Sequence, residues 1–223
     1  MRKILIPTTG PTDWKRFLAD PDKQWKRGFS AMAVAYSWEN ARGFPEEIAQ
    51  QLGARAELLI AIPEHKVSLP GGSGQSQCDI FALGRVEGTT IAVSVEAKVA
   101  EPFGPTIGEW LKNASPGKIA RLSYICDKLG LTQPVPHNLR YQLFHRTVAA
   151  VIEAERFKTD RAAMIIQSFS QEHRWFEDFA AFCALFGQVA ERSVPIEVTI
   201  SGGQRLTLGW ATGAPEFLSL DHI

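Results

Sequence analysis

Three polar side chains stand at the ends of two apolar segments that are close together in the sequence. Asp79 precedes the segment Ile80 to Leu83, and Glu96 and Lys98 end the segment that begins at Ile91. Side chains alternate between the two faces of a strand, so Glu96 and Lys98 share one face. Charged groups near the centre of a sheet are costly unless they are paired or used. This position is therefore the first candidate for chemistry.

Two carboxylates that converge make a hard oxygen site suited to Mg²⁺ or Mn²⁺, which predicts Asp79 and Glu96 as metal ligands. The metal would hold a phosphate oxygen and acidify a bound water molecule. Lys98 would orient that water or neutralise the charge that develops on the phosphorane. These parts suffice for hydrolysis of a phosphodiester. The alternative is that Glu96 and Lys98 form only an ion pair, which contributes little if it is exposed.

The spacing of an acid and a lysine two residues apart is not distinctive, and only its setting gives it weight. Three pairs with this spacing occur in the chain: Asp13 with Lys15, Glu64 with Lys66, and Glu96 with Lys98. Of these, only Glu96 and Lys98 end an apolar strand that follows a strand with an aspartate.

The spacing of apolar residues, together with glycine and proline residues that interrupt it, predicts the helices and strands that position these residues. The apolar segments around Asp79 and Glu96 flank a turn with Gly84 and Gly88, which predicts a β-hairpin. A helix is expected from Ser30 to the stop at Gly43, and a short second helix starts at Pro45. The remaining expected elements are a strand over Ala56 to Ile62 that ends at Pro63, helices over Ile107 to Leu111, Ile119 to Leu129 and Leu139 to Phe157, a strand over Ala162 to Phe169, a helix over Trp175 to Phe186, and a hairpin from Ile196 to Ile200 and Arg205 to Trp210. Met1 to Pro7 is expected as a short edge strand or an ordered arm.

Further polar residues lie where they could reach the same site. Glu39 is at the margin of the buried stripe of the first helix. Gln142, His145 and Arg146 share one face of the longest helix. Ser76, in the glycine-rich loop before the hairpin, could contact a phosphate through its hydroxyl or backbone N–H group.

The order helix, strand, strand with Asp79, strand with Glu96-Ala97-Lys98, helix, strand resembles the core of the PD-(D/E)xK nuclease superfamily. The resemblance covers about residues 30–170. It implies an α/β restriction-endonuclease-like fold, with a mixed central sheet flanked by helices and an α-β-β-β-α-β core. It also implies Asp79 and Glu96 as metal ligands and Lys98 as the catalytic lysine. Glu39 would match an extra acidic ligand.

On the helix after the triplet, Gln142 resembles the conserved glutamine of the RecB-like branch, and Arg146 becomes a candidate phosphate contact. Arg146 stands where that branch carries a tyrosine, Cys78 replaces the usual proline, and the insertion from Ala100 to Asn138 is long. The segment VEAKVAEPFGPTIGEWL is also typical of a bacterial protein family of unknown function.

Composition sets limits on these interpretations. The 223 residues have 45% hydrophobic content and a formal net charge of zero, which argues against a whole-surface nucleic-acid binder but leaves room for a basic cleft. No apolar run is long enough to span a membrane, and no signal peptide is recognisable, so a cytoplasmic location is expected. The three cysteines form no CxxC pair, which argues against a zinc site. One domain over 1–223 is expected, with residues 171–223 as a C-terminal elaboration.

The segment from Trp14 to Arg27 interleaves aromatic and basic residues. Such a pattern either stacks on bases and binds phosphates or pins the segment to the core.

The sequence thus predicts a metal-dependent nuclease that hydrolyses DNA phosphodiester bonds, in defence or DNA repair, with Mg²⁺ or Mn²⁺ as cofactor, DNA as partner and a homodimer as one open arrangement. The first alternative is a catalytically inactive protein of the same fold that binds nucleic acid or protein. A second is an unrelated α/β metabolic enzyme in which Glu96 and Lys98 only form an ion pair.

Overall fold

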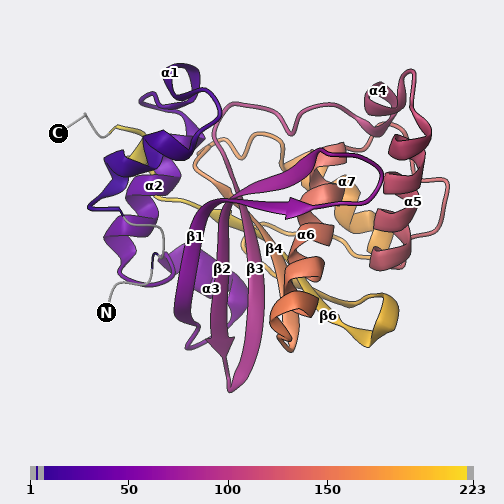
Figure 1. Cartoon of the computed structure of the whole chain (residues 1–223). Helices are drawn as coiled ribbons and strands as arrows, with labels where there is room; N and C mark the ends of the chain where they lie inside the picture. The colour runs from indigo at the N-terminus through magenta and orange to yellow at the C-terminus, as the bar shows by residue number, and fades with distance from the viewer. Residues whose placement is uncertain (1–3, 5–7, 220–223) are drawn as a thin grey trace.

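A six-stranded mixed β-sheet forms the centre of the protein, and helices cover both of its faces (Figure 1). The structure is a computed structural model that describes residue 4 and residues 8–219. The predicted strand at Met1 to Pro7 lies outside the described residues except for Ile4, which forms a parallel bridge with Ala61. The predicted α/β class is confirmed.

The sheet has the strand order β1-β2-β3-β4-β6-β5. The first three strands form an antiparallel meander, β3, β4 and β6 run parallel, and β5 is antiparallel to β6. A parallel connection requires a long crossover, which the helices between β3 and β4 supply. The strands are β1 (Glu57–Ser68), β2 (Gln75–Val86), β3 (Thr89–Lys98), β4 (Arg161–Ser168), β5 (Ile196–Thr199) and β6 (Arg205–Thr212).

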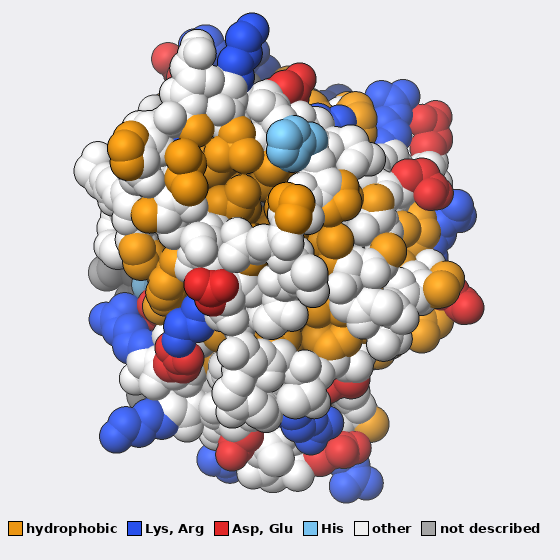
Figure 2. All heavy atoms as spheres, turned by 90° about the vertical axis from the view of Figure 1, so that its right-hand side faces the viewer, with side chains coloured by type: hydrophobic (Ala, Val, Ile, Leu, Met, Phe, Trp, Pro, Cys, Tyr) orange, Lys and Arg blue, Asp and Glu red, His pale blue; other side chains and the backbone are white. Residues whose placement is uncertain are grey.

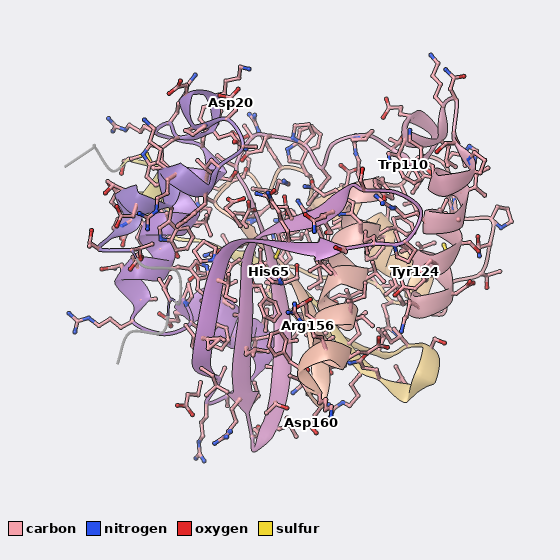
Figure 3. The ribbon with its side chains drawn as sticks, in the orientation of Figure 1. Asp20, His65, Trp110, Tyr124, Arg156 and Asp160 are labelled. Atoms are coloured by element: carbon pink, nitrogen blue, oxygen red, sulfur yellow. The ribbon has the colours of Figure 1, made fainter. Side chains whose placement is uncertain are left out.

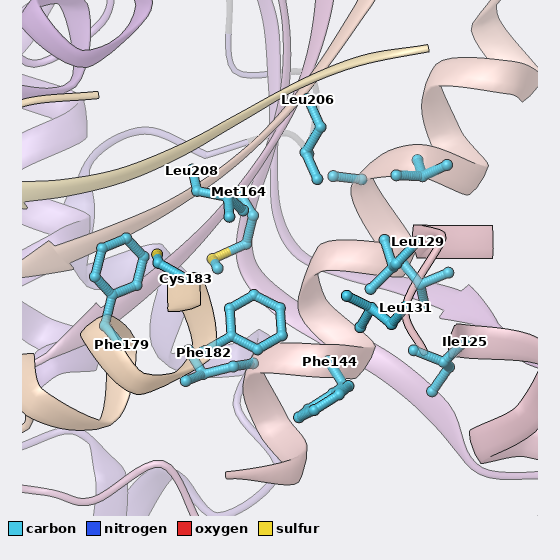
Figure 4. Packing of buried hydrophobic residues seen from close by; sticks show 14 of the residues in the cluster. Ile125, Leu129, Leu131, Phe144, Met164, Phe179, Phe182, Cys183, Leu206 and Leu208 are labelled. Atoms are coloured by element: carbon cyan, nitrogen blue, oxygen red, sulfur yellow. The ribbon is translucent and has the colours of Figure 1, made fainter. Parts of the chain in front are cut away.

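Two hydrophobic clusters, one on each face, hold the helices to the sheet. On one face Trp38 of α2 and Ile48 of α3 pack with Val93 of β3. On the other face Phe144 of α6 and Phe182 of α7 pack with residues of β4 and β6 (Figure 4). The helices are α1 (Pro21–Gln24), α2 (Ser30–Ala41), α3 (Glu46–Leu52), α4 (Ile107–Leu111), α5 (Pro116–Leu129), α6 (Tyr141–Phe157) and α7 (Phe176–Cys183).

A buried polar contact also ties β4 to the helices on the first face. Gln167 is fully buried, and its Oε1 accepts a hydrogen bond of 3.0 Å from Nε1 of Trp38. Its Nε2 donates to Oγ of Ser37 at 3.1 Å and to Oε1 of Glu47 at 2.7 Å. The amide is therefore satisfied on both sides, as burial requires.

Most predicted elements are present, with shifted boundaries. The strand predicted to end at Pro63 continues to Ser68, because β1 is an edge strand in which proline removes a donor that the sheet does not need. α2 begins at Ser30, as predicted, with Phe29 as its N-cap. The helix predicted over Trp175 to Phe186 comprises α7 followed by a 3₁₀ turn. α5 ends at Leu129, as predicted, and its C-cap Gly130 is left-handed with φ of 69°.

The hairpin of β1 and β2 is long, and its tip packs on α5. Arg121 donates hydrogen bonds to the carbonyl oxygens of Pro70 at 2.8 Å and Gly72 at 3.0 Å. Any Cβ at Gly71 would collide with the carbonyl oxygen of Gly117. This contact fixes where the chain enters β2. Over the described range, no helix is long and apolar enough to cross a bilayer.

Candidate functional site

A cavity of about 490 Å³ lies where the first residues of β2 and the last residues of β3 meet α6 and the N-terminal segment. It contains the four predicted catalytic residues, Asp79, Glu96, Lys98 and Gln142, and their nearest charged neighbours. The titratable and amide side chains on the sheet and α6 side are Glu64, Gln77, Asp79, Glu96, Lys98, Gln142 and Arg146.

Asp79 lies where β2 and β3 separate. The last paired residues of these strands are Ile80 and Val95, and beyond them Oδ2 of Asp79 accepts a hydrogen bond of 2.6 Å from the backbone nitrogen of Ala97. The Asp79 carboxylate thus replaces the missing strand partner. Burial raises the pKa of Asp79 well above its usual value, and the negative charge of Glu96 raises it further.

Glu96 is the most heavily bonded carboxylate in the cavity. Its Oε1 accepts hydrogen bonds from Nζ of Lys98 at 2.7 Å and Nε2 of Gln142 at 2.8 Å. Its Oε2 accepts from Nε of Arg146 at 2.5 Å. Burial alone would raise the pKa of Glu96, but the positive charges of Arg146 and Lys98 outweigh it and lower the pKa to about 2. Glu96 is therefore ionised at any physiological pH.

Lys98 and Gln142 lie where they were predicted. Lys98 is only 4% exposed, and its ammonium is 5.3 Å from the ring centroid of Phe103. Its backbone position on β3, two residues beyond Glu96, puts both side chains on the α6 side of the sheet. The structure thus brings Asp79, Glu96, Lys98 and Gln142 into one cavity.

The three residues predicted to contact nucleic acid form a cluster, but only one of them lines the cavity. Arg146 does so, and its Nη1 also donates to Oγ of Ser76 at 3.1 Å. Oγ of Ser76 lies 2.9 Å from Nδ1 of His145 and donates to the backbone oxygen of His145 at 3.1 Å. Burial, with the charge of Arg146, lowers the pKa of His145 to about 3, so its ring is neutral. Ser76 and His145 therefore support Arg146 and do not face the cavity.

Glu39 is not brought to this site. Its Oε1 accepts hydrogen bonds from Oγ1 of Thr8 and Nε1 of Trp14, both at 2.9 Å. It is not among the residues that line the cavity. The position of Glu39 at the margin of the buried stripe was identified from the sequence, but its neighbours at that margin are the N-terminal segment and not the sheet end.

Glu64 is the functional candidate that sequence reasoning missed. It lies on β1 with a left-handed φ of 53°, lines the cavity, and its Oε2 accepts a hydrogen bond of 2.6 Å from Nε2 of Gln77. Burial raises the pKa of Glu64 to about 7. The sequence shows the pair Glu64 and Lys66, but the pair lies beside Pro63 and no strand with an aspartate precedes it, so the sequence alone does not favour it.

The donor chemistry of the cavity suits a hard divalent cation. On the sheet and α6 side, three carboxylates, those of Glu64, Asp79 and Glu96, accompany two cations, Lys98 and Arg146. All available acceptors are oxygen atoms, the ligands that Mg²⁺ and Mn²⁺ prefer. A buried carbonyl oxygen, Oε1 of Gln142, has no hydrogen-bond partner among the residues that the structure describes. Within residues 8–219, however, no three His, Cys, Asp or Glu side chains are already grouped as a metal site.

The aromatic residues of the N-terminal segment pin it to the core, as one of the two interpretations predicted. Trp14 and Trp25 are buried. Between and beyond them, Leu18, Lys23 and Phe29 line the outer side of the cavity. The segment is thus both anchored to the core and part of the candidate site.

Comparisons with known proteins identify a family but no function. No curated protein and no solved structure matches the chain. A family model described as a domain of unknown function, DUF6946, matches residues 7–215. This range covers the whole sheet and every helix described above. The chain therefore belongs to the DUF6946 family of domains of unknown function.

Proposed function

We propose that the protein is a metal-dependent nuclease that hydrolyses DNA phosphodiester bonds. The observation that carries this proposal is the convergence of Asp79, Glu96 and Lys98 on one cavity. Burial of two carboxylates beside an ammonium group lowers the stability of the folded state, so a structural role alone does not explain it. The excess of one carboxylate over the cations on the sheet and α6 side adds to the argument, since a net negative charge favours binding of a divalent cation.

In this proposal each side chain has a distinct task. Asp79 and Glu96, with Glu64 nearby, would hold Mg²⁺ or Mn²⁺, which when bound polarises a phosphate oxygen and makes a bound water more acidic. Lys98 would place the attacking water and stabilise the charge on the phosphorane. Gln142, through its hydrogen bond to Oε1 of Glu96, would orient that carboxylate.

The test is a cleavage assay on linear, circular and single-stranded DNA with Mg²⁺ or Mn²⁺. Asp79→Asn and Lys98→Met should each remove activity. The matched control for the aspartate is Asp160→Asn, because Oδ2 of Asp160 accepts from the backbone nitrogen of Thr90 at 2.7 Å, at the other end of β3. Asp160 lies at the end of the molecule opposite Asp20 and α1 (Figure 3). Activity that survives both site variants would contradict the proposal.

One observation favours a second candidate, a non-catalytic protein that keeps the nuclease fold to bind nucleic acid or a protein. Both oxygens of Glu96 are already engaged by Lys98, Gln142 and Arg146. In that case DNA would bind without being cut with either metal, and Asp79→Asn would leave the affinity unchanged.

The proposal extends to place and assembly. The nuclease would act on DNA in the cytoplasm, in defence or DNA repair. Hydrophobic side chains gather on the side of the molecule that carries α4 and α5 (Figure 2). Ile119 of α5 is a large exposed apolar side chain. A homodimer would use this face, and sedimentation of the wild type beside Ile119→Asp would test it.

A further inference from the structure

The outer side of the cavity is formed by the N-terminal segment, and it differs in character from the inner side. Leu18, Lys23, Phe29 and the first turn of α2 line it. Phe29 is 43% exposed, although it is a large apolar side chain. Isolated exposed apolar residues are common on protein surfaces, so the exposure alone means little. Its place on the wall of a charged cavity is what requires an explanation.

The backbone at Phe29 holds the ring at the cavity. Phe29 is the N-cap of α2, with extended φ and ψ of −104° and 151°, so its side chain leaves before the helix begins. Ser30 and Ala31 also line the cavity. On the same side, the carboxylate of Glu101 is held by the backbone nitrogens of Ser30 and Val99, both at 3.2 Å.

Two ammonium groups accompany the ring. Nζ of Lys26 lies 6.0 Å from the centroid of the Phe29 ring. Lys23 lines the cavity from α1 and is highly exposed, with Asp20 as an ion-pair partner at 2.7 Å. An exposed aromatic face with cations beside it is the combination that binds single-stranded nucleic acid, because the ring stacks on a base and the cations meet the backbone.

We propose that Phe29, Lys23 and Lys26 form a subsite that stacks one unpaired base of single-stranded DNA beside the phosphate held by the inner side of the cavity. Bases within a duplex are already stacked on each other and cannot reach the ring without being extruded. A cavity of about 490 Å³ is also the size of a small-molecule site and suits nucleotides better than a duplex. The subsite would thus select single strands or frayed ends. This inference rests on the proposed nuclease function.

The test measures binding by fluorescence anisotropy, with a labelled single-stranded oligonucleotide and the duplex of the same sequence. Each is titrated in EDTA and again in Ca²⁺, a hard divalent cation. The wild type should bind the single strand more tightly. Phe29→Ala and Phe29→Leu should weaken single-strand binding by roughly tenfold, which is in the range for loss of one base–aromatic stack, and change duplex binding little. Phe29→Trp should retain it.

Phe157 provides the matched control. Its ring is 39% exposed, and the guanidinium of Arg156 lies 5.4 Å from its centroid, so both its exposure and its cation resemble those of Phe29. It ends α6, roughly 22 Å along the helix axis from Gln142. Phe157→Ala should therefore bind both DNA forms as the wild type does.

The outcomes separate this inference from the proposed function. Equal single-strand affinities for Phe29→Leu and Phe157→Ala, or no preference of the wild type for single strands, would overturn the subsite. Metal-dependent cleavage could persist in that case, and only the subsite would fail. Conversely, single-strand binding that depends on Phe29, without cleavage in Mg²⁺ or Mn²⁺, would support the subsite and contradict the nuclease. Urea unfolding of each variant would establish that it is folded.

Discussion

Oε2 of Glu96 accepts a hydrogen bond from Nε of Arg146 at 2.5 Å, which joins the end of β3 to the first half of α6 beneath the cavity. Both side chains are buried, and Arg146 continues to Oγ of Ser76 on β2. One guanidinium therefore links two strands and a helix. Such a buried pair holds the site in place, and it also occupies a carboxylate oxygen that a metal would use.

The first prediction concerns the stability that depends on this pair. Arg146→Met should lower the free energy of unfolding by about 3 kcal/mol, because loss of one partner leaves a buried charge less well compensated. Urea unfolding measures the change. The control is Arg174→Met: the side chains of Arg174 and its ion-pair partner Glu172 are 54% and 74% exposed, so loss of this pair should cost less than about 1 kcal/mol. Similar losses in the two variants would show that the pair contributes nothing special.

Cation binding can be detected without any DNA. At a free Mn²⁺ concentration ten times the Kd, the wild type should be stabilised by about 1.4 kcal/mol, seen as a rise in Tm. The rise should be larger at pH 8 than at pH 5.5, since protons compete for Asp79 and Glu64, whose pKa values are raised. Asp79→Asn should lose most of it, and Asp160→Asn should keep it. A Tm that does not change on addition of Mn²⁺ or Mg²⁺ at either pH would exclude a metal site in the cavity.

The third prediction is that titration of Glu64 contributes to the pH dependence of the free energy of unfolding. Its folded pKa of about 7 is above its ordinary value of 4.5, so its contribution is complete below pH 4.5 and disappears as the pH rises through 7. In EDTA, wild type should therefore lose stability relative to Glu64→Gln between pH 5 and pH 8, by on the order of 2 kcal/mol.

Glu109 supplies a control of opposite sign. Hydrogen bonds from the backbone and side chain of Thr106 lower the pKa of Glu109, which is exposed. The difference between wild type and Glu109→Gln should then stay constant from pH 5 to pH 8. If Glu64→Gln behaved in the same way, the Glu64 carboxyl would not titrate near neutrality.

A fourth prediction concerns the other face of the sheet. Gln167→Leu should cost about 3 kcal/mol in urea unfolding, because the buried N–H group of Trp38 and the carboxylate of Glu47 would lose their partner. Gln50→Leu is the comparison, since Nε2 of Gln50 is exposed and reaches Glu46 only at 3.4 Å. A Gln167 variant as stable as the Gln50 variant would mean that water replaces the amide.

The order of elements was predictable because long periodic segments and glycine or proline breaks report directly on local structure. The α6 face with Gln142 and Arg146 follows from helical spacing alone. Glu39 shows the limit of that reasoning: periodicity gives the face of a helix but not the element that covers it. Glu64 shows another limit, because a proline that would end a central strand is tolerated in the edge strand β1, and edge position is a property of the assembled sheet.

The sheet and α6 side of the cavity holds three carboxylates and two cations, and the outer side adds one of each, Glu101 and Lys23. When all three carboxylates on the sheet and α6 side are ionised, that side carries one net negative charge, which a bound proton or a cation would offset. The two compete for the same oxygen atoms, and a cation that binds near neutral pH must expel a proton into the buffer. Acidification would then release the cation by protonating its carboxylate ligands, and this release would not require the backbone to move. The acidity of the surroundings, and not only the supply of metal, would set how much of the protein is loaded.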